Sequence, residues 1–168
     1  KANIGGSGSG IVQYDSPEEL AEAVKGGAID MGVDHTVLIQ EKLPARGNQI
    51  VRVEVLNGKF LYAIKVGLSG SFNLCPADYC LPDGSPAIQG YTPPQDIIDT
   101  VERITHEANI EVGGVEYLIN DRDGEPYYYD INALSNFVAD AENVIGFDPF
   151  PKLVDFLVER AGITEPAL

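Results

Sequence analysis

The sequence has few basic residues, few cysteines and histidines, and no long apolar run. Eleven lysines and arginines stand against 26 aspartates and glutamates, which gives the 168-residue chain a formal net charge of −15. Such a charge repels a phosphate backbone, so we expect no nucleic-acid partner. The longest apolar stretches, such as the one ending at Ile64, are far too short to span a bilayer, and no stretch has the layout of a signal peptide. We therefore expect a soluble, cytoplasmic protein with no membrane contact.

Two cysteines and two histidines limit the metal chemistry that is open to the chain. Cys75 and Cys80 lie five positions apart, whereas His35 and His106 stand in unrelated contexts. A four-ligand zinc site needs further Cys or His ligands beside such a pair, so a pair of reduced thiols is the simpler interpretation. The length and apolar content are enough for one continuous hydrophobic core.

Alternating side chains predict part of an antiparallel sheet. Residues 50–55 and 60–66 alternate apolar and polar side chains, and Asn57 and Gly58 between them suit a two-residue type I′ hairpin turn. A first strand is expected to begin at Lys1. Apolar and β-branched runs predict further strands at 10–14, 36–41, 112–119 and 126–132.

Capping residues and helical spacing predict three helices. Ser16 and Glu19 form a capping box ahead of a helix over 17–25. Apolar residues at helical spacing predict a second helix that starts at Pro94 and a third over 149–161. The third helix is expected to turn three side chains inward, those of Leu153, Phe156 and Leu157.

A glycine-rich stretch near the start of the chain is the first candidate site. Lys1 precedes a run of small residues that includes Gly5, Gly6, Ser7 and Gly8. Small residues let backbone N–H groups approach an anion while the lysine supplies positive charge. A phosphate cradle and a flexible turn are both open on composition alone. Because the lysine comes before the glycines, the motif is not a Walker A loop.

Three oxygen-bearing side chains form the second candidate site. Alternation places Asp130 and Asn132 on one face of their strand, and Glu116 can lie beside them on the neighbouring strand. Two carboxylates and an amide oxygen suit magnesium, which takes its remaining ligands from water and phosphate groups. Solvated side chains on the face of a hairpin are the alternative interpretation.

These motifs occur in the order in which the ATP-grasp family carries them, and the chain resembles that family over about residues 1–158. The resemblance implies an α+β fold with antiparallel sheets, helices packed on one face, and two lobes that hold the nucleotide between them. It implies a small lobe over 1–43 and a large C-terminal lobe over 44–168. Because the sequence starts at Lys1 inside a motif, we expect a piece of a longer parent that carries a further N-terminal domain.

The resemblance also implies which residues bind ATP. Lys1 and the glycine-rich loop would hold the phosphates. The segment Gln40, Glu41, Lys42 and Leu43 resembles the hinge between the lobes, where backbone groups near Lys42 and Leu43 contact the adenine. Lys65, on the strand that returns from the hairpin, is expected to face the phosphates, although an exposed strand lysine is the simpler interpretation.

The same resemblance implies a catalytic residue and a metal site. Arg52 is similar to the family arginine that faces the transferred phosphoryl group. Glu116, Asp130 and Asn132 match the family's ligands for Mg²⁺ or Mn²⁺, with Asp130 at a position where Glu is usual. Segment 67–94, which has no periodic pattern, is where we expect substrate contacts.

The implied activity is that of an ATP-dependent carboxylate–amine ligase. Phosphorylation of a carboxylate would give an acylphosphate, which an amine attacks to form an amide. The expected partners are ATP, small carboxylate and amine substrates or a peptide acceptor, and further copies of the parent in a homo-oligomer. We expect the isolated piece to be inactive.

Other functions stay open at this point. A nucleotide-binding module that regulates a partner without catalysis is one alternative, and an interaction domain without nucleotide is another. A protein kinase is excluded, because the chain has neither a His-Arg-Asp nor an Asp-Phe-Gly motif.

Overall fold

The centre of the molecule is one antiparallel sheet of five strands. The structure is a computed structural model that describes residues 1–4, 10–68 and 88–162. The strand order is β3-β2-β1-β4-β5 and every neighbouring pair is antiparallel. The strands are β1 (Gln49–Leu56), β2 (Lys59–Gly67), β3 (Ile88–Tyr91), β4 (Val112–Ile119) and β5 (Pro126–Asn132). The sheet confirms the expected α+β class and four of the predicted strands; β3 was not predicted.

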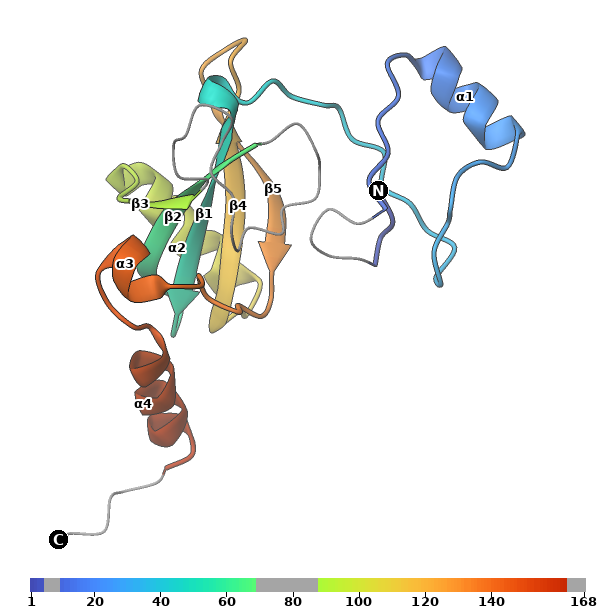
Figure 1. The fold of residues 1–168 in the computed structure, drawn as a ribbon. Helices are drawn as coiled ribbons and strands as arrows, with labels where there is room; N and C mark the ends of the chain where they lie inside the picture. The colour runs from blue at the N-terminus through green and yellow to red at the C-terminus, as the bar shows by residue number, and fades with distance from the viewer. Residues whose placement is uncertain (5–9, 69–87, 163–168) are drawn as a thin grey trace, which may run out of the picture.

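Helices lie on both faces of the sheet and beyond its edges (Figure 1). In the described residues they are α1 (Pro17–Lys25), α2 (Gln95–Glu107), α3 (Ala141–Ile145) and α4 (Phe150–Arg160), with a single 3₁₀ turn over Arg46–Asn48. Three of these four α-helices match the sequence prediction, and the short α3 was not predicted. None of the helices in the described part of the chain combines the length and the apolar character needed to cross a membrane.

Two hydrophobic clusters cover the two faces of the sheet. On one face, Ile97 and Val101 of α2 pack against the strands, and the cluster includes Val53 and Val115, which are fully buried. On the other face, Tyr62 and neighbouring β2 side chains pack against α3 and the residues around it. The buried members of the second cluster come mainly from β2, and Leu118 of β4 and Tyr129 of β5 pack against them.

Two β-bulges change which side chains face each helix layer. In the β1–β2 hairpin, Asn57 and Gly58 have positive φ angles of 54° and 66°, as a type I′ turn requires. Val55 pairs with Phe60 but Glu54 pairs with Tyr62, so β2 carries one extra residue. A one-residue shift moves all later side chains of a strand to the opposite face. The β4–β5 pair contains a second such shift between Glu116 and Tyr117.

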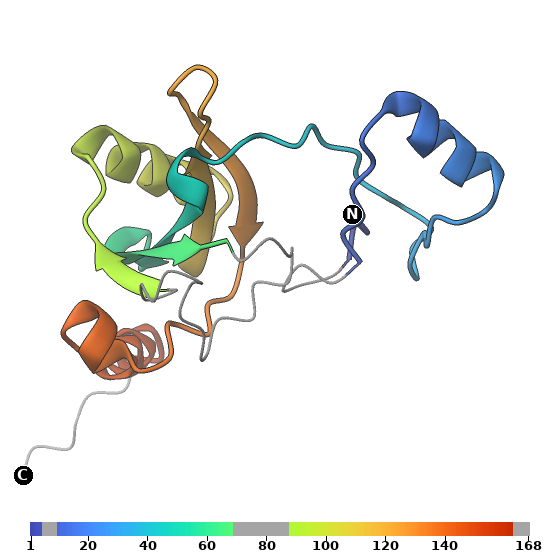
Figure 2. The same ribbon diagram turned by 45° about the horizontal axis from the view of Figure 1, so that its top comes forward.

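The first part of the chain lies beside the β5 edge of the sheet (Figures 1 and 2). There α1 starts as predicted, because the Ser16 side chain accepts the N–H of Glu19 at 3.1 Å. The strands expected at 10–14 and 36–41 are absent from the described residues. A strand needs a partner along its length, and the ladder here is limited to the bridge between Ala2 and Val37. The division into lobes at residues 43 and 44 stays a prediction.

The last helix, α4, buries less of its apolar side than the spacing predicted. Phe156 is 7% exposed and Leu153 is partly buried, whereas Leu157 is 53% exposed. The expectation that Leu157 points inward is therefore wrong. Helical periodicity marks an apolar stripe, but burial depends on a neighbouring element, and in the described residues none covers Leu157.

Candidate functional site

A row of charged side chains crosses three neighbouring strands on the face opposite α2. Arg52 of β1 lies directly opposite Glu116 of β4, and Glu116 lies directly opposite Asp130 of β5. Val51 and Val115, their neighbours along the strands, belong to the cluster packed against α2. Because successive strand residues point to opposite faces, the charged row lies on the other side.

A second row runs parallel to the first. Gly114 on β4 pairs with Glu54 on β1 and with Asn132 on β5. Together the two rows bring the three predicted oxygen ligands and the predicted arginine onto one area of the sheet, which we call the charged patch.

The bulge in β5 is what places Asp130 in the charged patch. Tyr117 pairs with Tyr128, whereas Glu116 pairs with Asp130, so Tyr129 is the extra residue. Without it, Asp130 would lie opposite Val115 and point toward α2. Bulges next to functional sites commonly re-aim a side chain in this way.

The side chains of the charged patch are within direct reach of one another. Arg52 Nε lies 2.5 Å from Glu54 Oε1, and Arg52 Nη1 lies 3.3 Å from Glu116 Oε1. The Tyr129 hydroxyl donates to Glu116 Oε2 at 3.0 Å. At the β5 side, Asn132 Nδ2 donates to Asp130 Oδ2 at 3.2 Å. Glu116 is thus held between an arginine and a phenol.

Lys1 reaches the charged patch from the start of the chain. Its Nζ lies 3.8 Å from Asp130 Oδ1, and its side chain is 21% exposed against 41% for that of Asp130. The backbone N–H of Leu38 donates to the Lys1 carbonyl at 2.8 Å, which ties this end of the chain to the segment that leads to the sheet. Two cations, Lys1 and Arg52, therefore flank the carboxylates from opposite sides.

Burial and charge act together on the titration of Glu116 and Arg52. Burial raises the pKa of the Glu116 carboxyl; the Tyr129 hydrogen bond and the Arg52 charge lower it, the Asp130 and Glu54 charges raise it, and the net pKa is above the usual value. Burial acts to lower the pKa of Arg52, but the charge and hydrogen bond of Glu54 and the charge of Glu116 outweigh it and raise that pKa.

The donor set of the charged patch fits a divalent cation. Three carboxylates, those of Glu54, Glu116 and Asp130, face the two cations Lys1 and Arg52. An added cation would balance the charge of the third carboxylate. Among the described residues no group of three or more His, Cys, Asp or Glu side chains is placed to hold a metal, so an all-protein cage is not present there. Two carboxylates and one amide match magnesium, which keeps several water or phosphate ligands.

The predicted nucleotide-binding residues divide into four groups, of which Lys65 is the last. Lys1 lies at the charged patch, as described. Gly5, Gly6, Ser7 and Gly8 lie outside the described residues, as do Cys75 and Cys80 and most of segment 67–94.

The third group is the predicted hinge, residues 40–43, which runs as an extended connection toward the sheet (Figure 2). Two side chains of this connection form hydrogen bonds, one with a residue near the start of the chain and one with a residue in the β4–β5 turn. Lys42 Nζ donates to Gln13 Oε1 at 2.6 Å, and Arg122 Nη1 donates to Glu41 Oε1 at 2.5 Å. Gln40 is exposed and Leu43 is partly buried. The hinge role of these four residues stays a prediction.

Lys65 is a predicted site residue that the structure separates from the charged patch. It pairs with Val51, and its Nζ lies 4.3 Å from the centre of the Tyr91 ring on the α2 face. The extra residue in β2 is the cause, because a regular hairpin would pair Lys65 with Ile50 on the face of Arg52. The structure therefore places Lys65 on the opposite face of the sheet from Arg52, and its contact with the phosphates stays a prediction.

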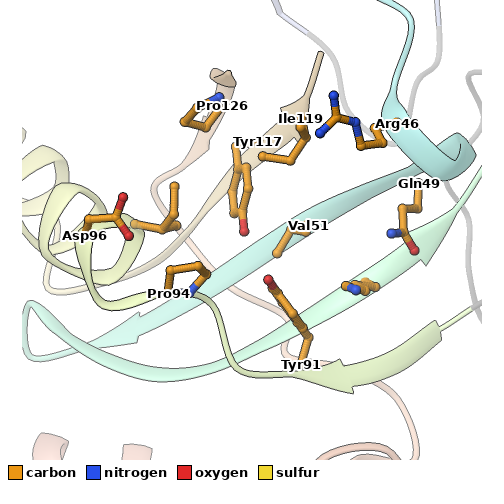
Figure 3. A pocket seen from close by; sticks show the side chains of 11 residues that line it. Arg46, Gln49, Val51, Tyr91, Pro94, Asp96, Tyr117, Ile119 and Pro126 are labelled. Atoms are coloured by element: carbon orange, nitrogen blue, oxygen red, sulfur yellow. The ribbon is translucent and has the colours of Figure 1, made fainter. Parts of the chain in front are cut away.

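Lys65 lines a hollow of about 270 Å³ on the α2 face instead (Figure 3). The Tyr91 and Tyr117 hydroxyls point toward each other above Val51, and Arg46 and Gln49 stand at one end. Arg46 already has a protein partner, since its Nε lies 3.2 Å from Asp121 Oδ1. The hollow is separated from the charged patch by the full thickness of the sheet.

The sequence patterns did not identify two residues that the structure places at the charged patch, Glu54 and Tyr129. Glu54 alternates with Arg52 along β1 and has the pattern of an ordinary surface residue, yet it is 1% exposed. Tyr129 has the pattern of a strand packing residue, yet its hydroxyl binds Glu116. The Gly114 position directly opposite Glu54 is the available signal, since a residue without a side chain leaves room for a buried one.

No family model matches the chain, and no curated protein matches it. Solved structures do match. The ligase PsnB in complex with minimal precursor, Mg and ADP, described as an ATP-grasp ligase, aligns with a TM-score of 0.55 at 17% identity. D-alanine–D-alanine ligase from Bacillus anthracis complexed with ATP aligns with a TM-score of 0.53 at 15% identity. The chain has the ATP-grasp fold.

The match covers most of this chain but a minority of each ATP-grasp structure. It covers 72% of this chain and 35% of PsnB, and 86% of this chain and 45% of the D-alanine–D-alanine ligase. The macrocyclase MdnB from Microcystis aeruginosa MRC aligns with a TM-score of 0.52 at 15% identity, over 88% of this chain and 47% of MdnB. At these identities the likeness shows the ATP-grasp fold alone.

Proposed function

We propose that the protein is part of an ATP-dependent ligase that joins a carboxylate to an amine. The observation that carries the proposal is the convergence of Lys1, Arg52, Glu116, Asp130 and Asn132 on one face of an ATP-grasp sheet. Solvated side chains on the face of a hairpin would be exposed, whereas Arg52 and Glu116 are partly or largely buried and pair across neighbouring strands, and Lys1 lies beside Asp130. Such an arrangement suits a triphosphate and its cation.

The two cations of the charged patch would bind the phosphates. Lys1 would act as a point charge on one side of the polyphosphate, and Arg52 would present its planar guanidinium to the transferred phosphoryl group. Charge that develops on the equatorial oxygens during transfer would be stabilised by these fixed groups. The two cations flank the charged patch, so both can contact one polyphosphate.

Glu116, Asp130 and Asn132 would hold Mg²⁺, with Mn²⁺ as a substitute. When bound, the metal neutralises charge on the phosphate oxygens and fixes their position. The Tyr129 hydroxyl and Arg52 keep Glu116 oriented, and burial keeps water away from its carboxylate. The proposed chemistry requires no acid–base side chain beside these ligands.

The chemistry would proceed in two transfers. A substrate carboxylate oxygen attacks the γ-phosphorus of ATP, the bond to the β,γ-bridging oxygen breaks, and ADP leaves. The amine then attacks the carbonyl of the acylphosphate, the bond from the carbonyl carbon to the phosphate oxygen breaks, and the departing phosphate takes up the proton that the amine loses as the amide forms. The net reaction consumes one ATP per amide bond.

We propose that a peptide or an amino acid supplies the amine or the carboxylate. PsnB has been solved with a minimal precursor and MdnB is described as a macrocyclase, which supports this substrate class. Small carboxylates and amines, as in D-alanine–D-alanine ligase, are the alternative within the same reaction.

A thermal-shift titration tests the proposal. The protein is titrated with ADP in the presence of Mg²⁺ and in the presence of a chelator, alongside Asp130→Ala and Asn132→Ala variants. A ligand at about 100 times its dissociation constant stabilises the native state by about 2.7 kcal/mol. Glu125→Ala is the matched control, because Glu125 is an exposed carboxylate in the turn of the same hairpin.

The expected result is a magnesium-dependent stabilisation that both site variants lose and the control keeps. Stabilisation by ADP that is the same with chelator and with Mg²⁺ would overturn the metal assignment. No stabilisation of the unchanged protein under any condition would overturn the proposed function.

A further inference from the structure

Glu54 is the most deeply buried charged side chain of the charged patch. Its residue is 1% exposed, and its Oε2 atom has no hydrogen-bond partner among the described residues. A buried carboxylate oxygen without a partner costs free energy, since desolvation is not compensated. Native proteins contain few such groups, and a role in a neighbouring site is one reason to retain one.

The backbone of β4 leaves room for this carboxylate. A Cβ atom at Gly114 would lie 3.0 Å from Glu54 Oε2 and 3.1 Å from Arg52 Nε. The ion pair between Glu54 and Arg52 therefore occupies the space that a side chain at position 114 would take. On the β2 side, Tyr62 pairs with Glu54 and is 5% exposed, so the carboxylate is enclosed from both neighbouring strands.

Arg52 has two carboxylate partners that are not equivalent. Glu54 holds Nε at 2.5 Å from a fully buried position, whereas Glu116 meets Nη1 at 3.3 Å. Glu116 is also the residue assigned to the cation. A carboxylate that takes up a divalent cation has less charge to share with a guanidinium, so the contact between Arg52 and Glu116 weakens when metal and nucleotide arrive.

We propose that Glu54 is a positioning residue, which holds the Arg52 guanidinium toward the transferred phosphoryl group after Glu116 has turned to the cation. Glu54 binds the Nε edge of the Arg52 guanidinium, so the opposite edge faces the charged patch. This inference rests on the proposed function. The buried charge then has a specific role, because it keeps Arg52 in one orientation whether or not nucleotide is bound.

The proposal predicts an effect limited to the last phosphate. Because Arg52 faces the transferred phosphoryl group, Glu54→Gln should weaken a non-hydrolysable ATP analogue about tenfold, or about 1.4 kcal/mol, and change ADP affinity by less than about twofold. Glu54→Asp retains the charge and should recover part of the difference. Isothermal titration calorimetry with Mg²⁺ on the purified protein gives both affinities. Glu102→Gln, which removes a carboxylate from the Lys59 ion pair elsewhere, is the control.

The outcomes separate this inference from the proposed function. Equal loss of ADP and analogue affinity in Glu54→Gln would indicate a merely structural residue and overturn the inference. Unchanged affinities for both would overturn it as well, while leaving the proposed function intact. Failure of the unchanged protein to bind either nucleotide would overturn the proposed function, and the inference with it.

A second measurement needs no change at Glu54. The Nε–H resonance of Arg52 is identified in a ¹⁵N spectrum by its loss in Arg52→Lys, and the unchanged protein is then titrated with Mg²⁺ and ADP. If Glu54 keeps its hydrogen bond to Arg52 Nε, we expect the resonance to persist and to stay protected from solvent exchange. Loss of the resonance to exchange on adding the ligands would overturn the inference even where Glu54→Gln fails to fold.

Discussion

Arg52 and Glu116 lie directly opposite each other on β1 and β4, with 3.3 Å between Nη1 and Oε1. The pair joins the residue proposed to bind the transferred phosphoryl group to a residue proposed to bind the cation. Each partner has a second contact of its own, since Glu54 binds the arginine and the Tyr129 hydroxyl donates to the glutamate. The site is therefore largely formed before any ligand arrives.

Lys1 should contribute to nucleotide affinity and little to stability. Its ammonium lies 3.8 Å from Asp130, where it can also contact a phosphate. We expect Lys1→Met to weaken Mg·ADP binding about tenfold, the size of one charge-assisted contact. Calorimetric titration checks this, with Lys25→Met as the control, since Lys25 is exposed and forms its ion pair within α1, to Glu22. Equal affinities for the two variants would contradict the role of Lys1.

Gly114 should tolerate no side chain. A Cβ there would press on both Glu54 and Arg52 at about 3 Å, within a buried ion pair that has little freedom to move. We expect Gly114→Ala to lower the free energy of unfolding by about 1–3 kcal/mol and to weaken nucleotide binding. Urea unfolding gives the first value. Gly26→Ala is the control, because Gly26 has helical φ and ψ angles and should change stability far less.

The Tyr129 hydroxyl should stabilise the fold through Glu116. Tyr129→Phe leaves a buried carboxylate oxygen without its donor, so we expect a loss of about 1–3 kcal/mol in the free energy of unfolding. Tyr127→Phe on the same strand removes a hydroxyl bonded to Asp123 at an exposed position. If Tyr127→Phe lowers the free energy of unfolding as much as Tyr129→Phe does, the buried hydrogen bond to Glu116 is not the reason for the loss of stability.

Glu102 should give the fold a measurable acid dependence. Lys59 Nζ lies 2.8 Å from Glu102, the Phe60 N–H donates to it at 3.0 Å, and these bonds lower the pKa of the Glu102 carboxyl. A carboxylate with a lowered folded-state pKa stabilises the fold above its unfolded pKa, and the stabilisation is lost as pH falls through the folded value.

We expect Glu102→Ala to cost about 1 kcal/mol at neutral pH, and the difference from the unchanged protein to shrink at a pH of about 3. Urea unfolding at the two pH values measures it, with Glu125→Ala as an exposed control. A difference that is constant with pH would mean that the ionised form of Glu102 contributes nothing.

Local sequence patterns predicted most of the sheet. Alternation marked β1 and β2, apolar and β-branched runs marked β4 and β5, and the turn at Asn57 and Gly58 fixed the first hairpin. β3 was not predicted, because its four residues, Ile88 to Tyr91, show no alternation of apolar and polar side chains and form a strand only by pairing with β2. α3 was not predicted, because it is too short for helical spacing to show and its N-cap, Asp140, has a φ of 52°.

The two bulges decided what could be predicted about the site. Alternation gives the face of each residue relative to its strand neighbours, but an extra residue reverses it. The bulge at Tyr129 brought Asp130 to the face of Glu116, whereas the bulge in β2 carried Lys65 away from Arg52. Neither bulge has a glycine or another local signal. The burial of Glu54 likewise depends on Gly114 across the sheet, which a single strand's sequence does not reveal.

A crystal structure of the protein with Mg²⁺ and a non-hydrolysable ATP analogue tests the central claim most directly. The account predicts a metal with oxygen ligands from Glu116, Asp130 and Asn132 at about 2.0–2.1 Å, and a terminal phosphate beside Arg52. A nucleotide bound instead in the hollow beside Lys65 on the α2 face, or a metal held without Asp130 and Glu116, would contradict it.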